Sequence, residues 1–441
     1  MSARLAAAGL STTLLLLATG ACTRGASTPT APTASTATKP TPSLAASTPD
    51  ALAPETCRPC HGAIVEAWSR SQHARSSSAA DPIYAAMGRL RATREGPAVL
   101  ESCARCHGPA RPGATPSEQA RAAQIGVGCD ACHGVVDVDA TGHATHAPAG
   151  AFAGPHTRAP RGDATATATT TAPHGLVASS SAARDGATIC LSCHGELANA
   201  AGVAACSTGV EWQRGADPRA SCVDCHMPWI DAPSGTASTR ARHRAHTFAG
   251  PHFALRARAV NPSGAVEPPG AAPAPVTLAG ALTPRVGRRD TLTLRATLTN
   301  VSGHAFPTGF PGRVVVLSLV GFDADDREVW RNVREDPMTE HPDAVLNRTF
   351  VDDKGAPTIA PYAARVARDT RLTPGEARTI EIEVPATVAY VQLKLVMRLV
   401  AAPLAARLGL EGPGVAPLLA PRPVAAAVAR RAAPTPARAP R

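Results

Sequence analysis

The sequence predicts two folded regions of different class: a mainly helical or irregular region at residues 54–258, followed by an antiparallel β-sandwich at 275–402. The second region carries runs in which apolar and polar residues alternate, as in Thr291–Thr299 and Val391–Val396. The first region lacks this alternation and has few large apolar side chains. Its aromatic residues between positions 57 and 226 are Trp68, Tyr84, Phe152 and Trp212. Such a segment would build a poor core from its own side chains.

Five copies of the pentapeptide Cys-x-x-Cys-His dominate the first region and use ten of the twelve cysteines. The motif cysteines are Cys57, Cys60, Cys103, Cys106, Cys129, Cys132, Cys190, Cys193, Cys222 and Cys225. The histidines that follow them are His61, His107, His133, His194 and His226. Two thiols about one helical turn apart can each form a thioether to a haem vinyl group, and the next histidine can reach the iron.

One copy of this motif is also compatible with a zinc knuckle, a redox dithiol or disulfides. Five copies with histidine always in the same place favour five covalently attached haem c groups, each with its iron. The haems would then supply the apolar core that the side chains lack, so the first region is expected to be a mainly α or irregular multihaem cytochrome c domain. No catalytic residue is predicted.

The formal net charge of +10 comes almost entirely from arginine. No run of basic residues interleaves with aromatic ones, so no nucleic-acid partner is expected. Haem propionates would offset much of the positive charge. A docking face for an acidic redox partner is left open.

The N-terminus resembles an export signal. A basic start, an apolar run to Thr19 and small residues before Cys22 are typical of a bacterial lipoprotein signal at residues 1–22, and the run is short for a membrane span. Thr19 departs from that pattern, so ordinary signal cleavage is the alternative. Residues 23–53 are a Thr/Pro/Ala linker expected to be disordered. We therefore expect an exported protein, periplasmic or anchored to the outer membrane of a bacterium through lipidated Cys22.

Two segments beyond the motifs carry a resemblance to a known family. Trp68 is followed by Ser71-Gln72-His73-Ala74, and the third motif stands in Gly126-Val127-Gly128-Cys129-Asp-Ala-Cys132-His133-Gly134. Over about residues 55–200 the chain resembles the tetrahaem cytochromes c that accept electrons from hydroxylamine oxidoreductase, the c-554-like proteins. The resemblance implies that His73 ligates a neighbouring haem and that His143, ten residues after His133, is a distal ligand. The fifth motif and the β-domain depart from that family, whose second haem is five-coordinate; whether this holds at Cys103 and Cys106 is left open.

The remaining histidines outnumber the ligand positions. The segments 143–156 and 243–252 both contain His-x-x-His and end in Phe-Ala-Gly-Pro-His, so both are expected to wrap haems. The predicted distal ligands are His73, His143, His174, His246 and His252. His304, in the loop Gly303–Gly309, could reach a haem or only fix a turn, and methionines are weak candidates. Cys206 is expected to be a buried thiol.

The favoured function is electron transfer through five haems in a respiratory or redox chain, with other cytochromes or a quinol or nitrogen-oxide oxidoreductase as partners. The alternative is a reductase of a small nitrogen or sulfur oxyanion at one five-coordinate haem, so enzymatic activity is left open. A third hypothesis makes the β-sandwich a docking module. Residues 403–441 are expected to be a frayed Ala/Pro/Arg-rich tail.

Overall fold

The computed structural model describes residues 53–139, 143–148, 150–154, 174–180, 185–215, 220–236, 238, 240–250, 274–285, 287–288 and 290–431. The predicted signal at residues 1–22 and the candidate ligand His252 lie outside these residues. Residues Thr48–Arg441 belong to one compact unit. Among the described helices, none is both long and apolar enough to cross a membrane.

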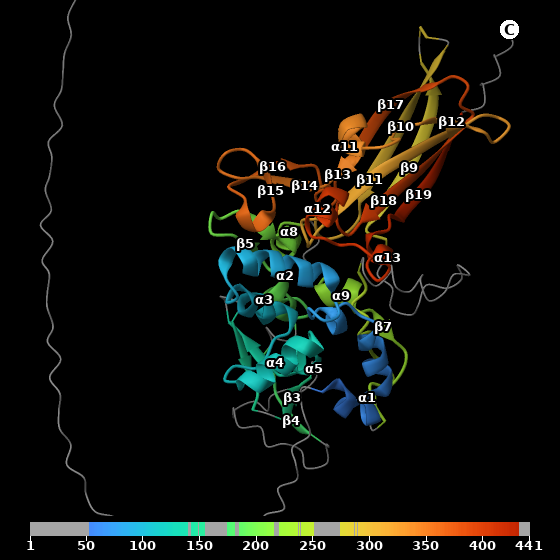
Figure 1. Ribbon diagram of the computed structural model, residues 1–441. Coiled ribbons are helices and arrows are strands. Elements are labelled where there is room, and N and C mark those ends of the chain that lie inside the picture. Colours follow the sequence, from blue (N-terminus) through green and yellow to red (C-terminus); the bar gives the residue numbers. More distant parts are fainter. Residues whose placement is uncertain are drawn as a thin grey trace, which may run out of the picture. The chain divides into compact units, whose positions relative to one another are not determined.

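Short helices carry all five motifs (Figure 1). The helices of this region are α1 (Pro54–Ser69), α2 (Pro82–Glu95), α3 (Val99–His107), α4 (Pro116–Ile125), α5 (Cys129–His133), α7 (Thr188–His194), α8 (Thr208–Gln213) and α9 (Cys222–His226), with a 3-10 turn η1 (His73–Arg75). Four of the motifs end their helix at the histidine. In α1 the helix instead kinks at His61, whose φ of −114° and ψ of 36° are not helical. Each motif therefore presents its two thiols and its histidine from one or two turns of helix.

Side-chain caps fix where several of these helices begin. Asp81 accepts hydrogen bonds from the first backbone N–H groups of α2. Thr115 and Glu118 form a capping box on α4, and Ser221 and Asp224 form one on α9 directly before the fifth motif. The motif on α9 is thus held at a defined helix start.

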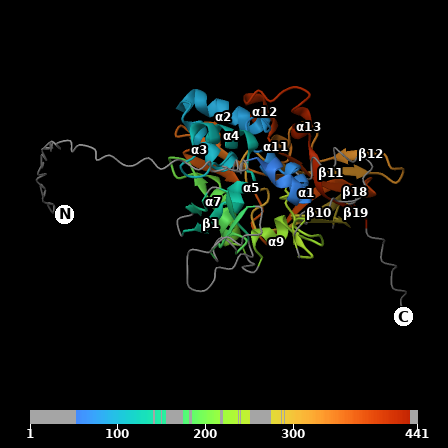
Figure 2. The same ribbon diagram turned by 90° about the horizontal axis from the view of Figure 1, so that it is seen from below.

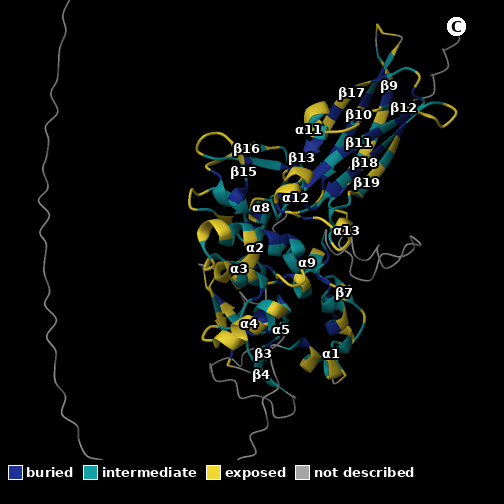
Figure 3. Ribbon diagram, in the orientation of Figure 1, coloured by how far each residue is buried: buried dark blue, intermediate teal, exposed yellow. Residues whose placement is uncertain are grey.

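Two-stranded pairs connect the helices. They are β1 (Val135–Val138) with β2 (Ala144–His146), β3 (Ala151–Ala153) with β4 (Gly175–Val177), β5 (Leu197–Ala198) with β6 (Ala204–Cys206), and β7 (Trp229–Ile230) with β8 (His243–Arg244). Only the β3–β4 pair is parallel among them. Helices α3, α7 and α9 bury none of their residues, and Figure 3 shows α3 in teal and yellow. The prediction of a region with little side-chain core is confirmed for its described part.

The second region is a sandwich of two antiparallel sheets (Figures 1 and 2). One sheet has the order β17 (Ala377–Pro385), β10 (Thr291–Asn300), β9 (Val276–Pro284). The other has the order β12 (Glu328–Arg331), β11 (Val314–Phe322), β18 (Tyr390–Arg398), β19 (Arg422–Arg430), with β13 (Val345–Leu346) also paired to β11. A smaller sheet joins β15 (Pro357–Thr358), β14 (Arg348–Val351) and β16 (Arg365–Asp369). The remaining helical elements are α11 (Pro337–Glu340), η2 (Pro342–Ala344), η3 (Ala360–Tyr362), α12 (Ala402–Arg407) and α13 (Ala416–Leu419).

The alternation of apolar and polar residues in the sequence corresponds to side chains that point alternately into and out of the sandwich. Leu292, Leu294 and Leu298 on β10 are buried together with Leu393 and Leu395 on β18. Burying a leucine side chain is worth about 1.5–3 kcal/mol, so this cluster supplies the largest side-chain core of the described chain. The predicted β-sandwich is confirmed.

The C-terminal boundary differs from the expected one. Residues 422–430 do not fray but form β19, which pairs with β18 from Tyr390–Arg430 onward and continues the sandwich past residue 402. Ala429 is fully buried in the core. The strand escaped prediction because alanine, proline and arginine give it no alternation of large apolar side chains.

Candidate haem-binding site

A single cavity of about 3380 Å³ is lined by all five motifs. A pocket for one small ligand usually measures roughly 300–1,000 Å³. Shared among five sites, the cavity gives each roughly 680 Å³, which falls in that range. The motif cysteines are unpaired thiols in the described residues, and Cys206 is another. The space and the donors therefore fit several large cofactors rather than disulfides.

Four motif histidines each face a second histidine ring. The pairs are His61 with His174, His194 with His73, His133 with His246, and His226 with His304, at ring-centroid distances of 6.4, 6.1, 6.1 and 6.3 Å. The members of a pair are far apart in the chain, from 78 positions (226 to 304) to 121 positions (73 to 194). Because the four pairs have almost the same ring-centroid distance, we infer that one structural cause sets it.

That spacing is the one expected for an iron held on both faces. A metal–imidazole bond is about 2.0–2.1 Å, so two axial imidazoles place their ring centroids roughly 6 Å apart. Direct stacking of two rings also occurs at 4.5–7 Å, but that contact is usually offset or edge-on. The residues present therefore fit bis-histidine haem sites, with the motif histidine on one face and its partner on the other.

Backbone carbonyls hold the Nδ1 atoms of most of these rings. The distances from Nδ1 to carbonyl oxygen are 2.7 Å for His61 with Ser234, 3.0 Å for His133 with Ala153, 2.6 Å for His226 with Ala249, 2.9 Å for His246 with Arg244, 3.1 Å for His304 with Ala305 and 3.3 Å for His174 with Gly175. A ring whose Nδ1–H donates to a carbonyl keeps Nε2 as the free lone pair. These contacts select Nε2 as the metal-binding atom and fix the ring orientation.

Burial keeps five of the paired rings neutral, as metal binding requires. It lowers the pKa of His73 to about 4 and that of His246 to about 3. Burial also lowers the pKa of His133, His194 and His304. These rings are therefore unprotonated at neutral pH.

The second motif is different. The His107 ring stacks on Tyr84 at 3.9 Å with an angle of 3° between the planes. No iron can lie between two rings that close, so Tyr84 is a neighbour of His107 and not the opposite ligand. His107 Nδ1 lies 3.2 Å from Ser76 O, as in the other sites. Among the described residues no second imidazole faces His107 in the manner of the four pairs.

The predicted distal ligands divide into three groups. His73, His174 and His246 stand opposite motif histidines, and their role as iron ligands stays a prediction. His143 is exposed, lies 3.9 Å from Asp139 and lines the same cavity, but it stands opposite no motif histidine within the described residues; its ligand role, implied by the family resemblance, also stays a prediction. His252 lies outside the described residues. His304, left undecided from sequence, completes the fourth pair.

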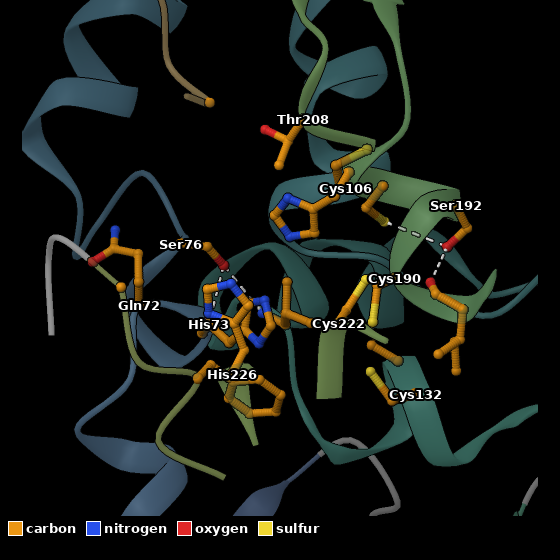
Figure 4. Close-up of a pocket in the computed structure, with 18 of the residues that line it drawn as sticks. Gln72, His73, Ser76, Cys106, Cys132, Cys190, Ser192, Thr208, Cys222 and His226 are labelled. Atoms are coloured by element: carbon orange, nitrogen blue, oxygen red, sulfur yellow. Dashed lines mark hydrogen bonds between the residues drawn. The ribbon is translucent and has the colours of Figure 1, made fainter. Parts of the chain in front are cut away.

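Thiols of different motifs lie close enough to shift one another's pKa, which indicates which sites are neighbours. The pairs are Cys57 with Cys129, Cys106 with Cys193, Cys190 with Cys222 and, through charge alone, Cys132 with Cys193. A hydrogen bond from the Cys129 thiol lowers the pKa of the Cys57 thiol. Figure 4 shows Cys106, Cys132, Cys190 and Cys222, from four different motifs, around one space. The first motif is thus next to the third, and the fourth motif is next to the second, third and fifth.

The two family-like segments touch each other. Trp68 Nε1 donates to Val127 O at 2.8 Å, and the Val127 N–H donates to His73 O at 2.9 Å. A Cβ at Gly126 would lie 2.6 Å from His73 O, which explains the glycine there. The tryptophan and the glycine-rich loop together fix the backbone of His73 beside the fourth motif.

The β-domain reaches the cavity through the loop that carries His304. Asn300 is fully buried and its Nδ2 donates to His304 O at 2.8 Å. A Cβ at Gly303 would meet the Trp212 ring at 3.2 Å, and one at Gly215 would meet Gly303 O at 2.6 Å. Close backbone approach between α8 and this loop therefore positions the ring opposite His226.

A buried ion network ties the same loop to the helical region. Glu211 on α8 accepts hydrogen bonds from Thr308 Oγ1 at 2.5 Å and from Arg371 Nη1 at 2.6 Å. Arg348 lies 3.7 Å from Glu211, and Asp369 binds both arginines at 2.9 Å. Nothing in the sequence singled out these residues, because they are more than 90 positions from Glu211 and carry no motif.

Cys206 is a part-buried thiol on β6, and burial raises the pKa of that thiol. This placement agrees with its interpretation as a buried cysteine. It lies near Arg313, which also lines the cavity.

Comparison with known proteins supports the haem interpretation. Residues 56–134 match the family model described as cytochrome c554 and c-prime. A penta-haem cytochrome c552 from Thermochromatium tepidum has a TM-score of 0.63 and 24% identity to this chain, with 85% of this chain and 98% of that chain covered. A Bordetella pertussis protein described as ApaA has a TM-score of 0.16 and 10% identity over 35% of this chain and 91% of that chain, which carries no argument. No curated protein matches the chain significantly.

The family match spans the first three motifs, Trp68, His73 and the glycine-rich loop, which are the residues that carried the resemblance. The match to the solved cytochrome spans both regions and shows a shared fold. The chain is thus similar to multihaem cytochromes c, related to the c554 type over residues 56–134 and extended by a C-terminal β-domain.

Proposed function

We propose that the protein is an exported c-type cytochrome that carries electrons through five covalently attached haems in a respiratory or redox chain. The observation that supports it best is the set of four histidine pairs at 6.1–6.4 Å. Two axial histidines leave a bound iron no open coordination position, which suits electron transfer better than substrate binding.

Bound haem would supply iron that changes between the ferrous and ferric states. The chain's own groups do the rest. The paired thiols of each motif anchor the cofactor, and the histidine pairs fill its axial positions. Contacts between motif cysteines bring neighbouring sites together in the order first, third, fourth, with the second and fifth both beside the fourth. The proposed electron-transfer route therefore branches at the fourth site, which contains Cys190 and Cys193.

Two measurements test the carrier proposal. Mass spectrometry of the purified holoprotein is expected to give five added haems, and loss of one haem is expected for each Cys-x-x-Cys pair changed to Ala-x-x-Ala. EPR of the ferric protein is expected to give low-spin signals for at least four haems. A protein with fewer haems, or with mostly high-spin iron, would refute the proposal.

A second candidate function is reduction of a small nitrogen or sulfur oxyanion at the site of Cys103 and Cys106. It is favoured by the environment of His107, which stacks on Tyr84 and meets no second imidazole among the described residues. Burial raises the pKa of Tyr84 to about 12, so this phenol stays a proton donor. The other four sites would deliver electrons to it.

Added nitrite and hydroxylamine separate the two functions. A high-spin EPR signal that shifts when either is added to the ferric holoprotein, with turnover when electrons are supplied, would establish the reductase. Five low-spin signals with no high-spin iron would exclude it and leave the carrier. His107→Ala then tests whether a high-spin signal belongs to the second site, because that signal should be lost in this variant.

The proposed location is the periplasm or the outer membrane, through lipidated Cys22, with redox proteins as partners. The basic surface around Trp229 supports an acidic partner. Trp229 is 41% exposed, and Arg242 and Arg244 lie over its ring at 4.5 and 4.3 Å. Arg244 also donates to Asp224, within the fifth motif. Exchange of electrons with an acidic cytochrome is expected to slow with rising salt and in Arg242→Glu.

A further inference from the structure

Arg313 projects into the haem cavity from the β-domain, immediately before β11. Its guanidinium packs against Gly309, where a Cβ would lie 2.8 Å from Arg313 Nη1. Gly309 has a φ of +76°, so the turn beneath the guanidinium requires glycine on two counts. Nη1 donates to Thr308 O, in the loop that also carries His304. The backbone is shaped to hold this side chain in place.

The positive charge of Arg313 has no carboxylate partner in the described part of the chain. Its Nε is buried and makes no hydrogen bond there. The charge of Asp81 acts on Arg313, but Asp81 already accepts from Ile83 N, Tyr84 N and Gln72 Nε2. Burial lowers the pKa of Arg313, yet a guanidinium stays charged in proteins. A buried charge is costly unless it is paired.

Three other largely buried arginines, Arg111, Arg348 and Arg371, are paired with carboxylates. Arg111 binds Asp130 and the carbonyls of Ala147 and Pro148. Arg348 and Arg371 share Glu211 and Asp369. The contrast indicates that Arg313 has a partner that the polypeptide does not provide.

The guanidinium lies beside the loop of the candidate ligand His304, because its Nη1 donates to Thr308 O in that loop. Thr308 also donates to Glu211 from α8. An anion on the free edge of Arg313 would therefore lie in the cavity next to the fifth site.

We propose that Arg313 is an anion-binding residue inside the cavity, taking a carboxylate or a small oxyanion on its Nε–Nη2 edge beside the loop that carries His304. A planar guanidinium fork binds such groups in a bidentate manner. The inference rests on the haem occupancy proposed above, because haem propionates are carboxylates and are one source of the anion. A free oxyanion such as nitrite is the other.

The experiment compares the wild-type holoprotein with Arg313→Gln and Arg313→Lys, and uses Arg378→Gln as the control. Arg378 is a part-buried arginine of the β-domain that pairs with Glu376 and does not line the cavity. Spectroelectrochemical titration gives the midpoint potentials without added oxyanion. Titration with sodium nitrite, followed in the Soret band, gives its dissociation constant. Haem content measured beforehand separates failure of this proposal from failure of the proposed function.

Removal of a positive charge beside the iron favours the ferric state, so Arg313→Gln is expected to lower the midpoint potential of at least one haem. Arg313→Lys should retain much of the wild-type value. A lowered potential in Arg313→Gln that Arg313→Lys largely restores, together with unchanged nitrite binding, assigns the anion as a propionate. Unchanged potentials, with nitrite bound about tenfold or more weakly by Arg313→Gln, assign it as a free oxyanion. Unchanged potentials and unchanged nitrite binding, or equal shifts in Arg378→Gln, would overturn the proposal.

Discussion

Removal of the Glu211 carboxylate should destabilise the junction between the two regions and release His304, the proposed second ligand of the fifth site. The Glu211 side chain is 11% exposed, and its partners Arg348 and Arg371 are each 12% exposed. Thr308, four residues after His304, donates to the same carboxylate. Glu211→Ala therefore removes the group on which the His304 loop and two buried arginines converge.

The expected loss of stability depends on the partners that Arg348 and Arg371 keep after Glu211 is removed. Removal of one partner of a buried ion pair costs about 3–5 kcal/mol, because the other charge is left uncompensated. Arg348 and Arg371 each keep Asp369 at 2.9 Å, so the loss should lie near the lower end, about 3 kcal/mol. Glu211→Gln keeps an acceptor for Thr308 and loses only the charge, so it should cost less.

The assay is urea denaturation of the ferric holoprotein, followed by far-UV circular dichroism and by the Soret band, together with EPR in the absence of urea. The midpoint of the transition should fall, and a new high-spin signal from the fifth site should accompany it as His304 detaches. Glu381→Ala is the matched control. Its pair with Arg295 at 2.7 Å is more than half exposed on both sides and should be worth under about 1 kcal/mol.

An unchanged midpoint in Glu211→Ala, or a loss no larger than that of Glu381→Ala, would refute the buried-network argument. A lower midpoint with an unchanged EPR spectrum would refute the link between this network and His304. The effect of the network on stability and its link to His304 are therefore tested separately.

Three further predictions concern individual side chains. His73→Met should alter the spectrum of one haem, that of the fourth motif with His194, and leave the first motif next to it in sequence unchanged in resonance-assigned NMR. His143→Gln tests the ligand role that the family resemblance implies for this cavity-lining ring: one low-spin EPR signal should be lost, and unchanged signals would exclude that role. In cells supplied with labelled palmitate, the wild-type protein should acquire label and Cys22→Ser should not; equal labelling would exclude lipidation at that residue.

The local features of this protein could be read from its sequence. The Cys-x-x-Cys-His units act within one or two turns of helix, so their spacing alone identifies the donors of each site. The strands around Leu292–Leu298 and Leu393–Leu395 carry their core in a period of two, which is equally local. Strand β19 carries no such pattern, because Ala425 and Ala427 pack with too little apolar bulk to stand out.

Pairs of residues that are far apart in the chain could not be predicted from the sequence, for a physical reason. An iron fixes only the distance between its two axial ligands, and it places no constraint on how far apart they stand in the chain. His246 follows the fifth motif yet faces His133 of the third, and His174 precedes the fourth yet faces His61 of the first. Proximity in sequence therefore pairs these histidines wrongly, and only the folded chain shows their partners.

The β-sandwich is best understood as part of the cytochrome. A docking module could be attached by a flexible linker and would need no contact with the cofactors. Here the β-domain supplies the ring opposite His226, an arginine that lines the cavity, and two arginines that bind Glu211 from α8. Each of these contacts would be lost if the domain moved by a few ångströms, so the proposed ligation of the fifth site depends on a folded, docked sandwich. A docking role for its outer surface is compatible with this arrangement, but it cannot be the reason why His304 and Arg313 point inward.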